Sequence, residues 1–191
     1  MTRAAANGSN RRARADHRSG TGSAGQRHGA SPRHNHQLCI EDALDRAEAV
    51  CAARGARLTP IRRRVLEIVW GQHQPIGAYA ILERLRKENA GAAPPTVYRA
   101  LEFLMAQGLV HRLASLNAFI GCPQPEAIHT SQFLICTSCG EVTEIDGGEI
   151  TASARRKAAE RGFSLDRLTI ELAGRCPRCD RRRDLATHAH R

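Results

Sequence analysis

Apolar side chains recur at three- and four-residue intervals in four stretches between residues 37 and 108, and this spacing predicts four amphipathic helices. In the second stretch, Thr59 is suited to cap a helix that starts at Pro60, where the missing N–H of proline is no loss. Gly108 ends the fourth stretch, PPTVYRALEFLMAQ. The predicted helices span residues 37–54, 60–70, 79–89 and 94–107.

Short extended runs replace the helical spacing after residue 108. Residues 109–113 and 118–121 are joined by Ser115-Leu116-Asn117, a length and composition typical of a β-hairpin. Helices followed by a hairpin are the element order of a winged helix-turn-helix. We therefore predict a DNA-binding domain of this type over residues 37–122.

A second region follows the hairpin. Residues 132–136 and 141–145 are predicted strands, residues 149–161 a helix, and the alternation of Leu168, Ile170 and Leu172 predicts a half-buried strand. The predicted fold class is thus α+β: an N-terminal winged helix-turn-helix, and then a small α+β domain over residues 125–180.

The basic charge of the chain lies mostly at its two ends. The net charge is +10 and the pI is about 10.1, and residues 1–36 hold seven arginines against one aspartate. Because residues 1–36 have almost no large apolar side chains, they are predicted to form a disordered basic tail, and residues 181–191 a flexible C-terminal tail. The N-terminal tail is either simply solvated or a nonspecific DNA-contacting arm.

The chain shows no sign of a membrane or secreted protein. No apolar run approaches the length of a membrane span, and the basic N-terminus lacks the apolar region of a secretory signal. We expect a soluble, cytoplasmic protein with no membrane partner. In that reducing compartment, its seven cysteines favour metal or redox chemistry over structural disulfides.

Four of the cysteines form two C-x-x-C pairs, Cys136 with Cys139 and Cys176 with Cys179. Together they match a structural zinc site, in which four thiolates surround the ion and leave no position for chemistry. A thioredoxin-type redox couple is the alternative, and it would need only one pair at a helix N-terminus. Because metal binding is largely folding free energy in a small domain, zinc removal is expected to unfold the second domain.

Four further zinc-capable side chains lie outside these pairs. Their nitrogen, sulfur and oxygen atoms suit tetrahedral zinc, and the thiolate disfavours manganese or magnesium. Each of the four also has an ordinary interpretation. The histidine can be a polar residue of the hairpin, the cysteine that follows the hairpin a small buried apolar residue, and the other two surface groups. The spacing of the four residues leaves both interpretations open. One shared ion would fix the angle between the domains and act as a switch. The four residues are His111, Cys122, His129 and Glu144.

Several stretches together resemble the ferric uptake regulator superfamily, and within it the zinc uptake regulator branch. They are LTPIRRRVLEIV (58–69), PPTVYRALEFLMAQGLVHRL (94–113), IHTSQFLICTSCGEVTEI (128–145) and the closing CPRC. The resemblance implies a zinc-responsive, homodimeric repressor of zinc uptake genes, with residues 125–180 as a dimerisation and metal-binding domain. It also implies two zinc ions per monomer, a structural ion on the four paired cysteines and a regulatory ion on His111, Cys122, His129 and Glu144.

The same resemblance implies where DNA is contacted. It places Tyr79 and Arg99 at the DNA, with Arg99 on the recognition helix. Such a dimer would present its two recognition helices to a palindromic operator in double-stranded DNA, and the sequence leaves open whether two dimers share one operator. Further candidates for base or phosphate contacts are one threonine on the recognition helix and three successive arginines on the second helix: Thr96, Arg62, Arg63 and Arg64.

Three alternatives remain at the level of sequence. A sibling regulator that senses iron, manganese or peroxide would usually carry an H-H-x-H run before the first C-x-x-C, where this chain has only His129. A thiol redox switch would release zinc on oxidation of the cysteine pairs. A zinc hydrolase would use Glu144 as general base but would need a substrate pocket that the sequence does not suggest. We predict a regulator and not an enzyme.

Overall fold

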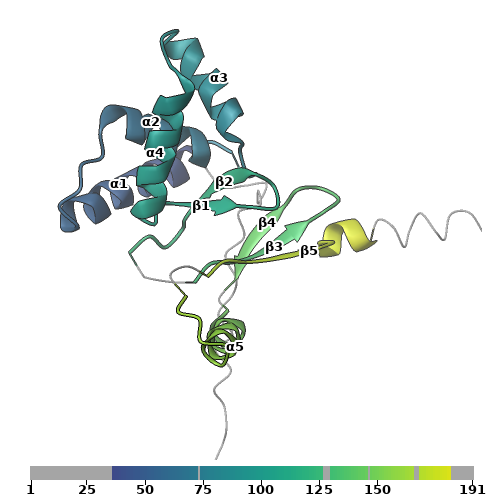
Figure 1. The fold of residues 1–191 in the computed structure, drawn as a ribbon. Helices are drawn as coiled ribbons and strands as arrows, with labels where there is room; N and C mark the ends of the chain where they lie inside the picture. The colour runs from purple at the N-terminus through teal and green to yellow at the C-terminus, as the bar shows by residue number, and fades with distance from the viewer. Residues whose placement is uncertain (1–35, 73, 127–129, 146, 166–167, 182–191) are drawn as a thin grey trace, which may run out of the picture.

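The computed structural model describes residues 36–72, 74–126, 130–145, 147–165 and 168–181 (Figure 1). Four helices and a hairpin precede a three-stranded sheet, which one longer helix accompanies and which a short helical turn at residues 177–181 follows. Apart from residues 36 and 181, the two predicted tails lie outside the described residues. The elements are α1 (His36–Ala53), α2 (Pro60–Trp70), α3 (Ala78–Glu88), α4 (Pro94–Ala106), β1 (Val110–Leu113), β2 (Ala118–Gly121), β3 (Gln132–Cys136), β4 (Val142–Ile145), α5 (Gly148–Ala159) and β5 (Ile170–Gly174).

The four predicted N-terminal helices are confirmed within one or two residues and enclose one apolar core. Leu66 of α2, Ile81 of α3 and Leu104 of α4 are almost completely buried in it. Helix α2 starts at Pro60 as predicted, and Thr59 occupies the cap position with extended backbone. The Thr59 side chain makes no cap hydrogen bond, so the fixed φ of proline and the apolar face set the start of this helix.

The hairpin β1–β2 lies between the helices and the sheet (Figure 1). Side chains alternate across a strand, so its two faces carry different residues. Val110 and Phe119 point to the core of the helices, and Phe119 also pairs through its backbone with Ile76. Leu113 and Ile120 point the other way and form a second core with residues of the sheet. The hairpin therefore joins the two cores.

The sheet has the strand order β4-β3-β5, with β4 antiparallel and β5 parallel to the central strand. Phe133, Ile135 and Val142 face the hairpin and complete the second core. Leu134 and its neighbour Leu172 lie on the opposite face and are 44% and 41% exposed.

The predicted half-buried strand is therefore present, but Leu172 is on its exposed side. The physical reason is the register: the strand begins at Ile170, and Glu171 shares a face with buried Phe133.

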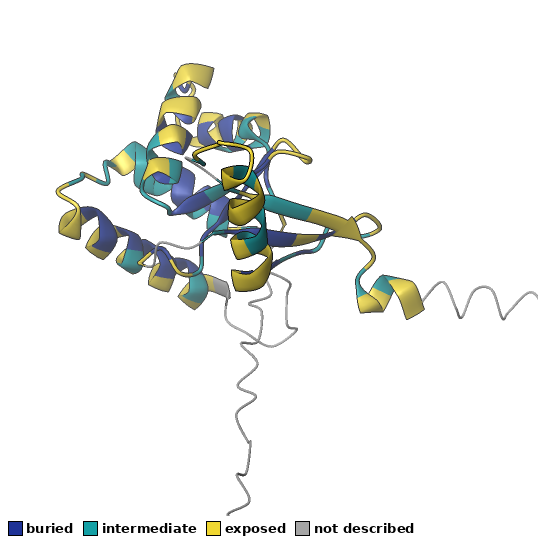
Figure 2. Cartoon of the chain, turned by 60° about the horizontal axis from the view of Figure 1, so that its bottom comes forward, coloured by how far each residue is buried: buried dark blue, intermediate teal, exposed yellow. Residues whose placement is uncertain are grey.

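Helix α5 has no buried residue (Figure 2). Its N-terminus is held by Gln132, a fully buried side chain of β3 whose Nε2 donates to the carbonyl of Gly147 at 2.8 Å and to Thr151 Oγ1 at 2.9 Å. The exposed surface of α5 and the exposed leucines leave one side of the sheet open. None of the described helices is both long enough and apolar enough to cross a membrane.

Candidate metal centres and DNA-binding surface

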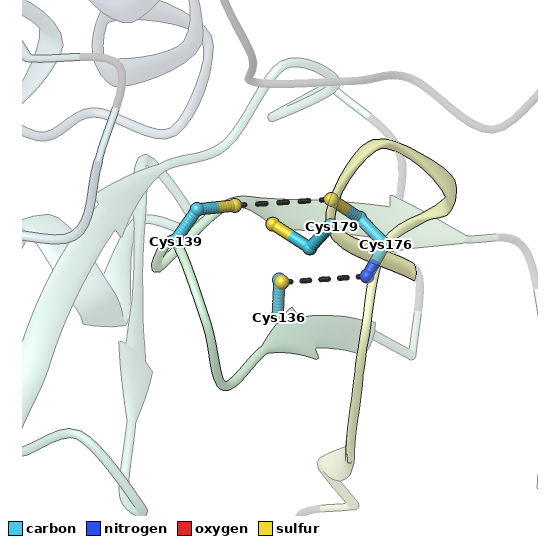
Figure 3. A group of neighbouring side chains, drawn as sticks. All are labelled: Cys136, Cys139, Cys176 and Cys179. Atoms are coloured by element: carbon cyan, nitrogen blue, oxygen red, sulfur yellow. Dashed lines mark hydrogen bonds between the residues drawn. The ribbon is translucent and has the colours of Figure 1, made fainter. Parts of the chain in front are cut away.

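The two C-x-x-C pairs meet beside strands β3 and β5 (Figure 3). Cys136 lies opposite Gly174 of β5, so the parallel register brings the second pair alongside the first. The four sulfur atoms lie within 4.8 Å of one another, and those of Cys139 and Cys176 are 3.8 Å apart. Tetrahedral zinc with Zn–S bonds of about 2.3 Å sets its sulfur ligands about 3.8 Å apart, so this four-cysteine cluster fits one zinc ion.

The surroundings of the thiols shift their pKa values in opposite directions. The backbone N–H of Cys176 donates to Cys136 Sγ at 3.3 Å and lowers the pKa of Cys136 to about 6. Hydrogen bonding with Cys139 raises the pKa of the Cys179 thiol to about 12. Several thiolates this close repel one another, and a bound cation removes that repulsion. The cluster is thus arranged to hold a cation.

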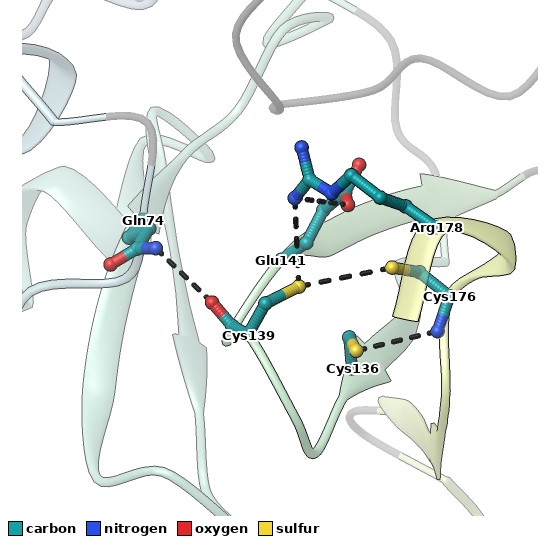
Figure 4. Close-up of polar contacts among 6 residues, drawn as sticks. All are labelled: Gln74, Cys136, Cys139, Glu141, Cys176 and Arg178. Atoms are coloured by element: carbon teal, nitrogen blue, oxygen red, sulfur yellow. Dashed lines mark hydrogen bonds and ion pairs between the residues drawn. The ribbon is translucent and has the colours of Figure 1, made fainter. Parts of the chain in front are cut away.

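Arg178, which lies between the two cysteines of the second pair, contacts the four-cysteine cluster (Figure 4). Its Nη2 is 3.7 Å from Cys139 Sγ and 3.3 Å from Glu141 Oε2. The backbone N–H of Glu141 and then this guanidinium lower the pKa of Cys139. Sequence reasoning did not identify Arg178, although a basic residue inside the second C-x-x-C was a usable signal.

A second cluster forms from His111, Cys122 and Glu144, whose potential ligand atoms all lie within 4.8 Å of one another. His111 Nε2 is 3.6 Å from Glu144 Oε1, and Ser131 Oγ lies 3.0 Å from His111 Nδ1. The structure thus brings together three of the four residues of the predicted regulatory site. The fourth, His129, lies outside the described residues.

The second cluster is buried, which excludes the reading of Glu144 as a surface group. Glu144 is 7% exposed and Cys122 only 3%. Burial raises the pKa of Cys122 to about 12, while a backbone N–H of Gln124 lowers it and the Glu144 charge raises it further. A thiolate and a carboxylate this close in a buried site would repel each other. A bound cation would stabilise both, so the donor set fits a metal ion.

The two β registers explain how residues far apart in the chain form this cluster. His111 pairs with Ile120 in the hairpin, and both point to the sheet. Glu144 pairs with Phe133, whose ring centroid lies 5.5 Å from that of His111. The hairpin therefore places His111 directly over the strand that carries Glu144.

The segment after the hairpin is held by a side chain of α1 and by Arg54, the residue that follows this helix. Arg46 Nη1 donates to the carbonyl of Pro123 and Arg54 Nη2 to that of Pro125, both at 3.0 Å. Elsewhere, Gln74 Nε2 donates at 3.2 Å to the carbonyl of Cys139, so the segment before α3 contacts the turn that carries the first cysteine pair (Figure 4). Side chains of the helical part thus hold both the peptide that follows Cys122 and the first cysteine pair.

Gly121 is required next to Cys122 because the indole of Trp70 lies against its backbone. A Cβ atom at Gly121 would come within 2.4 Å of the Trp70 ring. We expect Gly121→Ala to destabilise the protein by about 1–3 kcal/mol, since the ring must shift in a packed region. It should also change the emission of Trp70, the only tryptophan of the chain.

Thermal unfolding with Trp fluorescence measures both effects. Gly148→Ala is the matched control, because nothing lies within 4 Å of a Cβ there. Equal melting temperatures for the two variants would show that the Trp70 contact does not hold Gly121 in place.

The predicted DNA contacts on α3 and α4 are accessible. Tyr79 is 70% exposed, Arg99 is exposed and Thr96 is half-buried. Among the described residues, Arg99 has no hydrogen bond or ion pair, so its guanidinium is available to a ligand. Tyr98, which is 53% exposed beside Arg99, was missed by sequence reasoning although it lies in the motif TVYRAL.

The three arginines of α2 differ from Arg99 because each has a protein partner. The Arg62 guanidinium lies 3.5 Å from the ring centroid of Phe103, Arg63 pairs with Glu48, and Arg64 is 2.7 Å from Glu67 Oε2 and also pairs with Glu88. Their role as phosphate contacts stays a prediction. Exposed ion pairs are worth little, so exchange of a glutamate for a phosphate remains energetically accessible.

Residues 53–173 match the ferric uptake regulator family. The chain belongs to this family, whose members are transcriptional regulators and not enzymes. The predicted family is thereby confirmed, and the hydrolase alternative is dropped.

Within this family, the chain is similar to zinc uptake regulation proteins. The zinc uptake regulation protein of Escherichia coli (strain K12) is 42% identical over 142 residues, which cover 73% of this chain and 82% of that protein. The zinc uptake regulation protein of Mycobacterium tuberculosis (strain ATCC 25618 / H37Rv) is 29% identical over 67% of this chain and 98% of that protein.

Two solved structures are also similar to this chain in sequence and in fold. A zinc uptake regulator complexed with zinc and DNA is 39% identical and superposes with a TM-score of 0.72, over 76% of this chain and 97% of that chain. A structure described as holo XcZur is 38% identical, with a TM-score of 0.68 over 77% of this chain and 99% of that chain.

Proposed function

We propose that this protein is a zinc-responsive transcriptional repressor that binds operator DNA and controls zinc uptake genes. The observation that carries the proposal is the buried cluster of His111, Cys122 and Glu144, because a thiol in the set selects zinc over harder cations. The 42% identity to a zinc uptake regulation protein and the similarity to a regulator complexed with zinc and DNA support it.

The proposal assigns two zinc ions to each monomer. The four-cysteine cluster would hold the structural ion, and His111, Cys122 and Glu144, together with His129, the regulatory one. Zinc would supply the positive charge that allows the Cys122 thiolate and the Glu144 carboxylate to lie side by side away from water. The protein itself supplies part of the geometry: Ser131 Oγ lies 3.0 Å from Nδ1 and 3.2 Å from Nε2 of His111, so this hydroxyl contacts the imidazole whichever ring nitrogen faces the ion.

The regulatory cluster would act by fixing the hairpin on the sheet. His111 and Cys122 belong to the hairpin side, whereas Glu144 belongs to the sheet. In our proposal, β1–β2 is the wing of a winged helix-turn-helix over residues 37–122. Ligands on both sides of one ion then favour the arrangement in which the wing is docked, and this arrangement sets where α4 can reach DNA.

We infer a homodimer formed through residues 125–180. Among the described residues, β5 pairs only with β3, so its outer edge is open to another strand. Exposed Leu134 and Leu172 of the sheet and exposed Ile150 of α5 add apolar surface to this part of the chain. Two copies would present two α4 helices to a palindromic operator. Sedimentation equilibrium tests this, and a monomer at every concentration would contradict it.

Arg99 of α4 would be the main DNA contact, with Tyr98 and Thr96 of the same helix and Tyr79 of α3 as further contacts. We expect Arg99→Ala to weaken operator binding by ~1–3 kcal/mol if the guanidinium contacts a base edge. Fluorescence anisotropy with labelled operator and scrambled DNA measures the loss.

Lys87→Ala, which removes an exposed charge from the last turn of α3, is the control. Operator affinity that is the same for Arg99→Ala and for the wild type would remove Arg99 from the DNA interface.

The function is tested by titrating free zinc with a buffered chelator while measuring zinc content and operator binding. Two zinc ions per monomer, with DNA binding only at the higher occupancy, are expected. If iron under anaerobic conditions restores binding better than zinc, the chain is a sibling iron sensor. If mild peroxide releases zinc and abolishes binding at physiological zinc, a redox switch is favoured instead.

A further inference from the structure

Three side chains form a row across the sheet on the face toward the hairpin. Phe133 of β3 is the middle member, with Glu144 beside it on β4 and Glu171 beside it on β5. Glu144 belongs to the second metal cluster, and Phe133 packs near the ring of His111. Glu171 lies on the other side of Phe133 and takes no part in either metal cluster.

Glu171 contacts the turn at the tip of the hairpin. Its Oε1 accepts a hydrogen bond from the backbone N–H of Ala114 at 2.6 Å, and its Oε2 accepts one from Ser115 at 3.0 Å. Partial burial raises the pKa of Glu171, but the hydrogen bonds from Ser115 and Ala114 outweigh it and lower the pKa. Both oxygens of an ionised carboxylate are thus used on two consecutive amides, which is a strong form of hydrogen bonding.

The backbone N–H groups of the turn do not need Glu171 as a hydrogen-bond acceptor. Residues 114–117 are exposed, so water could accept from the same two N–H groups. The contact instead links Glu171 to Ala114 and Ser115, which precede it in the chain by 57 and 56 positions. It exists only when the hairpin lies on the sheet. Its free energy therefore belongs to the docked arrangement.

We propose that Glu171 is a positioning residue that docks the tip of the hairpin, while the cluster of His111, Cys122 and Glu144 docks its base. The hairpin also rests on the sheet through Leu113 and Ile120 of the second core, but apolar contacts are not directional, so they leave its tip free to tilt about the metal cluster. Two attachments on either side of Phe133 fix the direction of the hairpin. The proposal rests on the proposed function, because it assigns Glu171 a share of the coupling between zinc and DNA.

The consequence is a shift in the docked population. Loss of the Glu171 contact weakens docking without removing any metal ligand, so more zinc is needed to reach the same docked fraction. The four-cysteine cluster, which lies at the other end of β3 and β5, should be unaffected.

Four proteins test the proposal: the wild type, Glu171→Ala, Glu171→Gln and Glu149→Ala. Glutamine keeps the shape and one good acceptor, so it should restore part of the effect. Glu149 is an exposed carboxylate of the same part of the chain and has no hydrogen bond or ion pair among the described residues, so Glu149→Ala is the matched control. Two measurements are made: operator binding at buffered free zinc, and hydrogen exchange of the peptide covering residues 109–121.

Glu171→Ala should require roughly tenfold more free zinc for half-maximal operator binding. It should also exchange its hairpin-tip amides faster, while it keeps two zinc ions at saturation and wild-type exchange in α2 and α4. Glu171→Gln should lie between it and the wild type. A Glu171→Ala titration that matches Glu149→Ala would overturn the proposal. Faster exchange throughout the chain with loss of the structural zinc would also overturn it, because the residue would then serve the fold in general.

The outcome remains separate from that of the proposed function. A wild type that binds operator equally with and without zinc would defeat the proposed function. In that case the docking role is tested by the operator affinity measured without zinc. A lower affinity of Glu171→Ala than of Glu149→Ala would support the role, and equal affinities would contradict it.

Discussion

Cys122→Ser is expected to give a folded protein that binds one zinc ion per monomer and no longer binds operator DNA when zinc is added. Serine keeps the size of the buried side chain but removes the soft ligand, and a hydroxyl is a far weaker ligand than a thiolate. Because the Cys122 side chain is only 3% exposed, water cannot readily enter and replace the lost thiolate as a zinc ligand. At the free zinc that saturates the wild type, operator affinity should fall at least about 100-fold, toward the nonspecific level.

Zinc content by mass spectrometry and operator binding by anisotropy measure the two effects in the same samples. Cys39→Ser is the control, since Cys39 is a half-buried thiol of α1 outside both metal clusters. Equal melting temperatures of the two variants would show that the fold is retained. If Cys122→Ser binds the operator as the wild type does, the second cluster is not the regulatory site.

The helices and strands were predictable because their signals are local. Thr59-Pro60 marks the start of α2. Gly108, which follows the last residues of α4, adopts a positive φ of 65°, a backbone conformation that commonly ends a helix. The pairing of the two C-x-x-C motifs was also predictable, because four thiols at such spacing have few other uses. The exceptions are the Thr59 side chain, which makes no cap hydrogen bond, and Leu172, which is exposed because strand register cannot be read from alternation within one strand.

The second cluster shows where sequence reasoning stops. His111, Cys122 and Glu144 share no helix face, and their residue types allowed ordinary readings as well as a metal site. They meet only because the hairpin register turns His111 toward the sheet and the β3–β4 register puts Glu144 beside Phe133. Family resemblance identified the set in advance, whereas the physical reason for it is contained in two strand registers.

Contacts between distant side chains were missed for the same reason. Arg63 pairs with Glu48 of α1 and Arg64 with Glu88 of α3, and the sequence showed only a run of three arginines. The contact of Glu171 with the hairpin tip depends on β5 lying parallel to β3, which a single strand pattern does not specify. The ion pairs of Arg63 and Arg64 show which charges of α2 are already paired within the protein.

Removal of the zinc from the four-cysteine cluster is expected to unfold the sheet and abolish operator binding, whereas the core formed by α1 to α4 retains most of its helix. Within the part of the chain that the structure describes, the second core contains only five buried residues, three of them from the sheet. A core of that size gives little stability, and structural zinc contributes about 10 kcal/mol or more to folding in small zinc-binding peptides. Cys176→Ser should have the same effect, since its loss opens the tetrahedral set and removes one of the four thiolates.

Hydrogen exchange separates the two parts of the chain during this experiment. After treatment with a strong chelator, or in Cys176→Ser, amides of β3 and β5 should lose protection while those of α2 and α4 keep it. Thr137→Ala is the control, because it removes one hydrogen bond to the carbonyl of Gly174 beside the cluster and no ligand. Protected β3 amides in zinc-free protein would contradict the structural role, since the sheet would then be stable on its apolar contacts and α5 attachment alone. Loss of protection in the helices as well would show that the hairpin, which belongs to both cores, transmits the collapse of one to the other.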